Sequence, residues 1–352
     1  MTPRAQLGVL TVERARAAFM RGGSTVSAGG ALTKAIETGS VIALLSMVAA
    51  VPLLGLLALG YLLEAQARLL RREAGVLPEA AAAPVLLRRL IGAWLLALPA
   101  RLLWHAQRDA RVIAPEGRAA SVLAWLTAAA AAVAVAVVAR RAWRDRRAVV
   151  LRLVRLEPLR LLWLATGAVL GALAWLAAPS ALWAAARSSG TERPGLVLLG
   201  GALLVPVLLW LPFLQARFAS TGNWRDLVAV KPVRAAFRRA PLAFFVALLA
   251  TVALTLPLWL SKIVAPPRDA ALLVTPLFVI AILPARLLTA WALRRGTERA
   301  TPVTGLIVWP VRLAALGLTF AYAGFLFVAP LVDSHGSGAL LRHHAFLLPT
   351  PF

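Results

Sequence analysis

The chain has 352 residues, of which 61% are hydrophobic, and its mean hydropathy is +0.81. Soluble domains are only about half apolar, so this composition excludes an ordinary soluble protein and predicts an all-α, polytopic transmembrane bundle. The net charge of +24 does not indicate a nucleic-acid-binding protein, because the basic residues are spread between apolar runs and no nucleic-acid-binding motif is present.

The N-terminal residues 1–38 are polar and basic, and we expect them to form a tail ahead of a transmembrane domain at 39–332. The first long apolar run, Val41 to Leu63, is too long for the apolar part of a secretory signal and has the length of a first span. The next run, Leu90 to Trp104, is ambiguous. It reaches only about 22 Å as a helix, and Arg101 would have to extend its charge to an interface.

Six further apolar runs have the roughly 20 residues that a transmembrane helix needs. Tryptophans such as Trp125 and Trp143 lie near their ends, which supports the boundaries because indole rings favour the headgroup level. A short tail at 333–352 follows the last run. The six runs are Ser121 to Ala139, Leu161 to Ala186, Gly195 to Phe213, Pro241 to Leu260, Ala270 to Ala292 and Leu313 to Val332.

The total is eight spans if residues 90–104 cross the membrane and seven if they do not. Basic residues concentrate in cytoplasmic loops. Both topologies place equally many of them on the cytoplasmic side, so this rule fixes the orientation only after Arg140. The N-terminus lies outside with eight spans and inside with seven.

Internal similarity favours eight spans. The tripeptide QAR occurs at Gln66 to Arg68 and at Gln215 to Arg217, each time after an apolar run with a Val-Pro pair and before a later Arg-Arg pair. This register predicts four helical hairpins, each with a basic cytoplasmic connector. The competing repeat, LPARLL at 98–103 and 283–288, would place the basic stretch 140–160 outside, so we interpret it as a coincidence of composition.

Several stretches also resemble a group of uncharacterised bacterial multi-pass membrane proteins, known as a domain of unknown function. The resemblance implies a bacterial inner membrane and implies no activity, cofactor or functional residue. The basic loops are expected in the cytoplasm from the distribution of arginines. The stretches are GYLLEAQARLLRREAGVLPE at 60–79, LPFLQARFA at 211–219, LPARLLTAWALRRG at 283–296 and HAFLLPTPF at 344–352.

The stretch 140–160 carries eight arginines and is the candidate for contact with anionic lipid. Arg144, Arg147, Arg152 and Arg155 recur at near-helical spacing beside an apolar face, as in a helix at the inner interface. The alternative is an ordinary basic loop between two spans.

Two glycines, Gly167 and Gly171, form a GxxxG pattern that lets helices approach closely, either within the chain or in a homo- or hetero-oligomer. The central parts of the predicted spans contain no Asp or Glu. We expect Glu64 and Asp333 to be hydrated near interfaces, and Glu157 to be a counter-ion for the surrounding arginines.

No catalytic, cofactor-binding or metal site is predicted. The zinc-helix, P-loop and nucleophile-elbow motifs are missing, and the histidines at 335, 343 and 344 match no common ligand spacing. We favour a non-catalytic membrane scaffold, assembly or lipid-contacting component whose partner is the bilayer. The alternative is a transporter or permease subunit that uses unwound backbone at prolines such as Pro206, Pro212 or Pro276.

Overall fold

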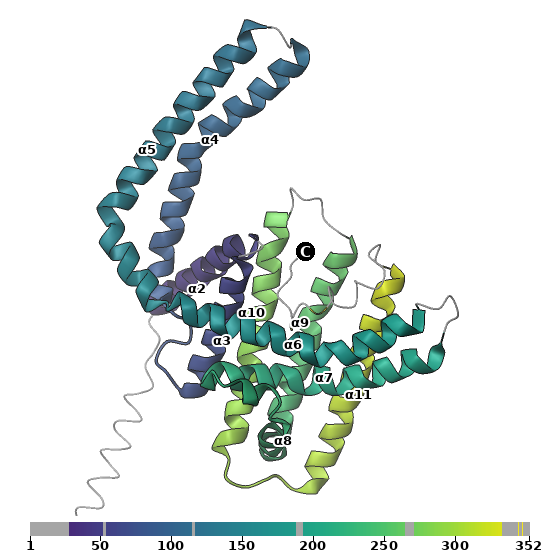
Figure 1. Ribbon diagram of the computed structural model, residues 1–352. Helices are drawn as coiled ribbons and strands as arrows, with labels where there is room; N and C mark the ends of the chain where they lie inside the picture. The colour runs from purple at the N-terminus through teal and green to yellow at the C-terminus, as the bar shows by residue number, and fades with distance from the viewer. Residues whose placement is uncertain are drawn as a thin grey trace, which may run out of the picture.

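The computed structural model describes residues 28–51, 54–114, 117–187, 193–264 and 271–332, together with His344 and Leu347. Figure 1 shows a body of packed helices from which a long two-helix arm, α4 and α5, projects. The described residues form helices and no strand. The helices are α2 (Ala28–Ala49), α3 (Gly55–Arg71), η1 (Ala80–Ala82), α4 (Ala83–Ile113), α5 (Arg118–Arg155), α6 (Pro158–Arg187), α7 (Pro194–Thr221), η2 (Trp224–Leu227), α8 (Val230–Arg239), α9 (Pro241–Val264), α10 (Ala271–Glu298) and α11 (Gly305–Val332).

Within the described residues, eight helical segments are long and apolar enough to cross a membrane, which confirms the predicted all-α polytopic bundle. The ambiguous run at 90–104 lies inside α4, which is one helix of 31 residues and about 46 Å long. That length exceeds the roughly 30 Å of a hydrocarbon core. The chain is therefore a multi-pass integral membrane protein.

The predicted first span, Val41 to Leu63, is wrong. Helix α2 ends at Ala49 and α3 begins at Gly55, and the segment that is long and apolar enough to span is Gly29–Ala49. The helix therefore begins inside the stretch that we expected to be a polar tail. The sequence has a proline at position 52, and proline cannot continue a helix because it lacks the N–H and clashes with the preceding turn.

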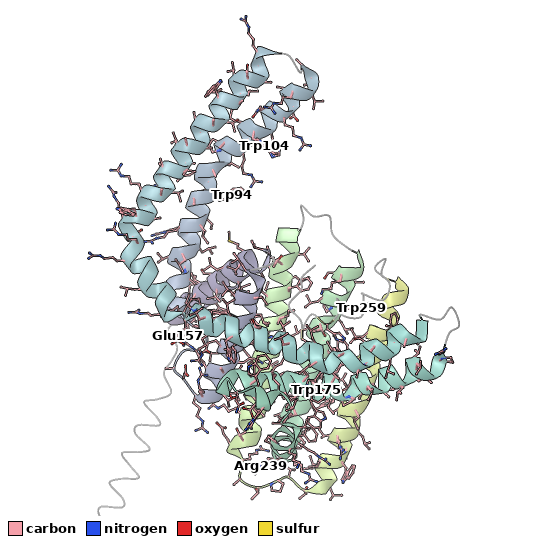
Figure 2. The ribbon with its side chains drawn as sticks, in the orientation of Figure 1. Trp94, Trp104, Glu157, Trp175, Arg239 and Trp259 are labelled. Carbon is pink, nitrogen blue, oxygen red and sulfur yellow. The ribbon has the colours of Figure 1, made fainter. Side chains whose placement is uncertain are left out.

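The arm joins the body through a sharp elbow at Glu157, labelled in Figure 2. Helix α5 ends at Arg155 and α6 begins at Pro158, so only two residues separate them. Glu157 has the left-handed φ of 46°, and the residue before a proline avoids the helical region. The chain therefore changes direction here. As expected for Glu157, its carboxylate pairs with a neighbouring guanidinium, that of Arg160, at 3.6 Å.

Helical hairpins are present, but their register is shifted relative to the predicted one. The sequence-adjacent helices that pack most extensively are α4 with α5, α6 with α7, and α9 with α10. These pairs are joined by the short connectors 114–117, 188–193 and 265–270 instead of the basic ones. A short connector keeps antiparallel helices side by side, whereas the basic connector after α7 contains two helices of its own, η2 and α8.

The core of the body is built from close helix contacts and aromatic rings. The Phe213 and Phe244 rings lie 4.4 Å apart, and Phe237 meets Phe244 edge-on at 5.6 Å. Helices α3 and α6 touch at Gly60, where any Cβ would overlap the backbone of Leu161. Such contacts let the body pack helices backbone to backbone, as small residues allow in membranes.

Candidate functional site

An apolar cavity of about 280 Å³ lies between α2, α3 and the junction of α5 with α6. Its wall includes Val41, Leu45 and Val48, which recur on one face of α2, and Leu57 of α3. Tyr61 also lines the cavity, but its hydroxyl donates a hydrogen bond to the carbonyl oxygen of Pro78 at 2.7 Å. The cavity therefore offers mostly aliphatic and ring carbon, and Glu79 is the charged residue of its lining.

A basic cleft of about 530 Å³ adjoins this cavity, because Leu44 and Leu86 line both spaces. Four charged residues line this cleft. Arg88 and Arg89 lie near the start of α4, and Arg141 and Asp145 lie on α5. The antiparallel packing of α4 on α5 brings these residues together from positions more than fifty apart in the sequence.

The charge of this cleft is only partly compensated. An Arg89 Nη2 atom lies 3.1 Å from a carboxylate oxygen of Asp145. Within the described residues, Arg88 and Arg141 form no ion pair, so the cleft keeps a net charge of about +2. We call the apolar cavity and the basic cleft together the α2–α4–α5 groove. The groove thus joins an apolar wall to a positively charged one.

Glu64 lies on α3 and is buried, with 7% of its surface exposed. Its carboxylate lies 2.6 Å from Arg71, 3.2 Å from Arg160 and 3.5 Å from Arg68. The prediction that Glu64 is hydrated at an interface is therefore wrong. Its burial is tolerated because guanidinium groups surround it. Asp333, for which we made the same prediction, lies outside the described residues.

The QAR repeat marks two buried glutamines. The Gln66 side-chain amide donates to the carbonyl oxygen of Arg286 and to the hydroxyl of Thr289, both at 2.8 Å, and its oxygen accepts from the Arg286 guanidinium at 3.2 Å. The Gln215 amide donates to the carbonyl oxygens of Ala168 at 3.2 Å and Leu347 at 3.4 Å. Both glutamines are fully buried: Gln66 joins α3 to α10, and Gln215 joins α7 to α6 and to the C-terminal segment. Sequence reasoning found this repeat but not its role.

The two LPARLL copies lie in unlike surroundings. Arg286, in the second copy, is 1% exposed in the body, whereas Arg101, in the first, is exposed on the arm. A true structural repeat would place equivalent residues in equivalent surroundings. The interpretation of this repeat as a coincidence agrees with that difference.

The predicted lipid-contact residues lie on the last turns of α5. Arg144, Arg147 and Arg155 are exposed, and the side chain of Arg152 lies outside the described residues. The stretch continues the spanning helix and is not a separate interfacial helix up to Arg155. Contact of these four residues with anionic lipid stays a prediction.

Of the two alternatives for Gly167 and Gly171, the structure shows close packing within the chain. A Cβ at Gly167 would overlap the ring of Phe218, and one at Gly171 would come within 2.8 Å of Leu227. Trp175 on the same helix donates its indole N–H to the carbonyl oxygen of Leu227 at 2.9 Å, so α6 packs closely on α7 and η2 of its own chain. These glycines serve intramolecular packing.

The C-terminal segment was expected to be a tail, yet its two described residues lie inside the body. His344 and Leu347 are 1% and 2% exposed and pack against α7, α9 and α11. His335 and His343 lie outside the described residues. Among the residues that the structure does describe, no three His, Asp or Glu side chains gather as metal ligands.

Comparisons of this chain with family models, with curated proteins and with solved structures found no match.

Proposed function

We propose that the chain is a non-catalytic membrane scaffold that holds a phospholipid in the α2–α4–α5 groove. The observation that carries this proposal is the continuity of an apolar cavity with a basic cleft through Leu44 and Leu86. A phospholipid has the same two halves, an apolar chain and a phosphate, joined in the same order. The cytoplasmic side of a bacterial inner membrane is the proposed location of the basic cleft, in line with the distribution of arginines.

The exposed arginines that follow the groove along α5 support the same proposal. Arg144, Arg147 and Arg155 extend the basic surface from Arg141 towards the elbow, and each basic residue near an anionic surface contributes roughly 1 kcal/mol of attraction. The groove would hold one lipid, and Arg144, Arg147, Arg152 and Arg155 would contact the headgroups around it.

The alternative of a transporter has less support. Pro206 and Pro212 lie inside the continuous helix α7, and Pro276 lies inside α10, so these prolines do not unwind the backbone into a binding site. The buried side chains of Gln66 and Thr289 bond to each other, so their hydrogen-bonding groups are used within the chain.

The test is lipid mass spectrometry on protein extracted with its surrounding membrane. Changing Arg88, Arg89 and Arg141 together to Gln should lower the affinity for anionic phospholipid, and with it the co-purified lipid, by up to about a hundredfold, because about 1 kcal/mol is lost for each of the three residues. The matched control changes the three exposed arginines at the opposite end of the arm, Arg108, Arg111 and Arg118, to Gln. This control should retain its lipid.

A second variant addresses the apolar half without changing charge. Val48→Trp should fill the cavity and displace the acyl chain, so bound phospholipid should fall while the elution volume of the folded protein stays unchanged. Equal lipid content in the groove variants and in the control would rule out the groove as a lipid site.

A further inference from the structure

A second basic pocket, of about 160 Å³, lies at the opposite side of the body from the arm, between α7, α8 and α11. Three arginines line it: Arg234 and Arg238 from the short helix α8, and Arg312 from α11. Its remaining lining is apolar and includes Leu209 and Trp210 of α7. No acidic residue lines this pocket.

The three guanidinium groups have no counter-ion within the described part of the chain. None of them forms an ion pair or a hydrogen bond there, and Arg312 only lies over the ring of Trp309 at 5.2 Å. The other convergent arginines of the body surround a carboxylate: Glu64 has three arginines within 3.5 Å, and Arg217 pairs with Asp226. Like charges that converge without a counter-ion repel one another, so this pocket is complementary to an anion.

The helix that supplies two of these arginines is strongly amphipathic. Val233, Ala236 and Phe237 are buried against the body, while Arg234 and Arg238, one turn apart, are exposed. Trp210 and Phe237 meet edge-on at 6.3 Å and form part of the pocket wall. The α8 backbone is fixed as well, because the carbonyl oxygen of Arg238 accepts a hydrogen bond from Val303 N at 3.0 Å. The arginines are therefore presented from a rigid element.

We propose that this pocket binds a phosphate group, which bridges Arg234 and Arg238 on α8 to Arg312 on α11. Guanidinium groups recognise phosphate through paired N–H donors, and three of them reach an anion that has several acceptor oxygens. The apolar lining suits the glycerol and first methylenes of a phospholipid, and inorganic phosphate offers the same recognition without them. The site shares no residue with the α2–α4–α5 groove and does not depend on it.

The experiment measures the thermal unfolding midpoint of the full chain in an uncharged detergent. Inorganic phosphate is titrated at constant ionic strength, and a separate arm adds phosphatidylglycerol to the micelles. At a ligand concentration tenfold above Kd, the midpoint should rise by about 2–4 °C and then saturate. The double variant Arg234→Gln with Arg312→Gln should lose this rise.

Two matched variants separate a phosphate site from a general charge effect. Arg225→Gln with Arg295→Gln removes two exposed arginines outside the pocket and should keep the full rise. Arg234→Lys with Arg312→Lys keeps the charge but loses the paired donors, so its apparent Kd should be roughly tenfold higher. Each variant's unfolding without phosphate is the reference, so a change of basal stability does not obscure the result.

The outcomes are distinct. A rise with inorganic phosphate identifies a soluble phosphate source, and a rise with phosphatidylglycerol alone identifies a lipid headgroup, provided that either depends on Arg234 and Arg312. An equal rise in both Gln double variants, or no rise in either arm for the unmodified chain, overturns the proposal. The lipid content of the groove variants tests the other site, so neither loss nor retention of lipid there changes how the phosphate titration is interpreted.

Discussion

The arm and the body have similar apolar sequences but bury them differently. In its most apolar stretch, α5 has 6% of its residues buried, whereas α10 in the body has 61%. Trp125 and Trp143 of α5 are 78% and 69% exposed and lie 18 residues apart, about 27 Å along the helix. That separation is close to the roughly 30 Å of a hydrocarbon core. The arm thus has the surface of a hairpin solvated by lipid, and Figure 2 places Trp94 and Trp104 on it away from the body.

The body instead uses small residues and polar side chains that would be costly in lipid. Gly60 and Gly296 bring helices into backbone contact, and Gln66 and Arg286 bond to each other in the interior. Polar side chains in a membrane interior need internal partners, which only a packed body provides. An apolar run therefore indicates where the chain can enter a membrane. The small and polar residues within that run indicate whether the helix packs against lipid or against other helices.

The largest expected effect comes from adding one methyl group in the body. Gly60→Ala should lower the free energy of unfolding by about 3 kcal/mol, because its Cβ would overlap the backbone of Leu161, which cannot move aside as a side chain can. Gly92→Ala on the arm meets nothing within 4 Å and should stabilise its helix by about 0.5–1 kcal/mol. Denaturant unfolding in detergent measures both. Equal changes in the free energy of unfolding for the two variants would contradict the difference in helix packing between arm and body.

The two LPARLL arginines give the next largest contrast. Arg286→Met should cost about 2 kcal/mol, since it leaves the buried Gln66 oxygen without its guanidinium donor. Arg101→Met, in the same local sequence on the arm, should change the free energy of unfolding by less than about 0.5 kcal/mol. The comparison uses the unfolding midpoints of both variants, and a large loss at Arg101 would contradict the exposed position of that residue.

Removing one carboxylate from each region should have a smaller effect. Glu64→Gln should cost about 1–2 kcal/mol, because three partly exposed guanidinium groups lose their buried counter-ion. Asp145→Asn breaks a more exposed pair with Arg89 on the arm and should cost at most about 0.5 kcal/mol. Thermal unfolding of the two single variants distinguishes them. A Glu64→Gln variant as stable as the unmodified chain would contradict the buried ion-pair network and support the hydrated Glu64 that the sequence predicted.

The smallest expected effect is a pH dependence at the end of α3. The hydrogen bond from Arg71 lowers the pKa of Glu73 below its ordinary value of 4.5. The resulting stabilisation is present above that ordinary pKa and is lost as the pH falls through the lower folded-state pKa. Glu73 is largely exposed, so we expect less than about 0.5 kcal/mol. Unfolding at pH 6 and pH 3 should differ slightly less for Glu73→Gln than for the unmodified chain, and an equal or larger difference would argue against this pair.

Several features of the fold could be predicted because they depend on local composition. Long apolar runs identified α5, α6, α7, α9, α10 and α11 with nearly correct positions, and the QAR repeat supported the eight segments that the structure contains. The break between α2 and α3 was missed because a proline inside an apolar run is compatible with a kinked span as well as with two helices. The groove was missed because Arg88 and Arg141 come together only through the pairing of α4 with α5.

The sequence by itself determined the membrane class, the helical content and the position of most spans, since these follow from the cost of placing polar groups and unpaired backbone in hydrocarbon. The tertiary structure decided which of two identical hexapeptides is buried, that Glu64 is enclosed by arginines, and that Gly167 contacts its own chain. It also decided which arginines converge on a cavity and which line the exposed arm. The physical reason is that the free energy of entering a membrane is a sum over the residues of one segment. The burial of a residue, and the convergence of arginines on a cavity, depend instead on which distant helix lies alongside.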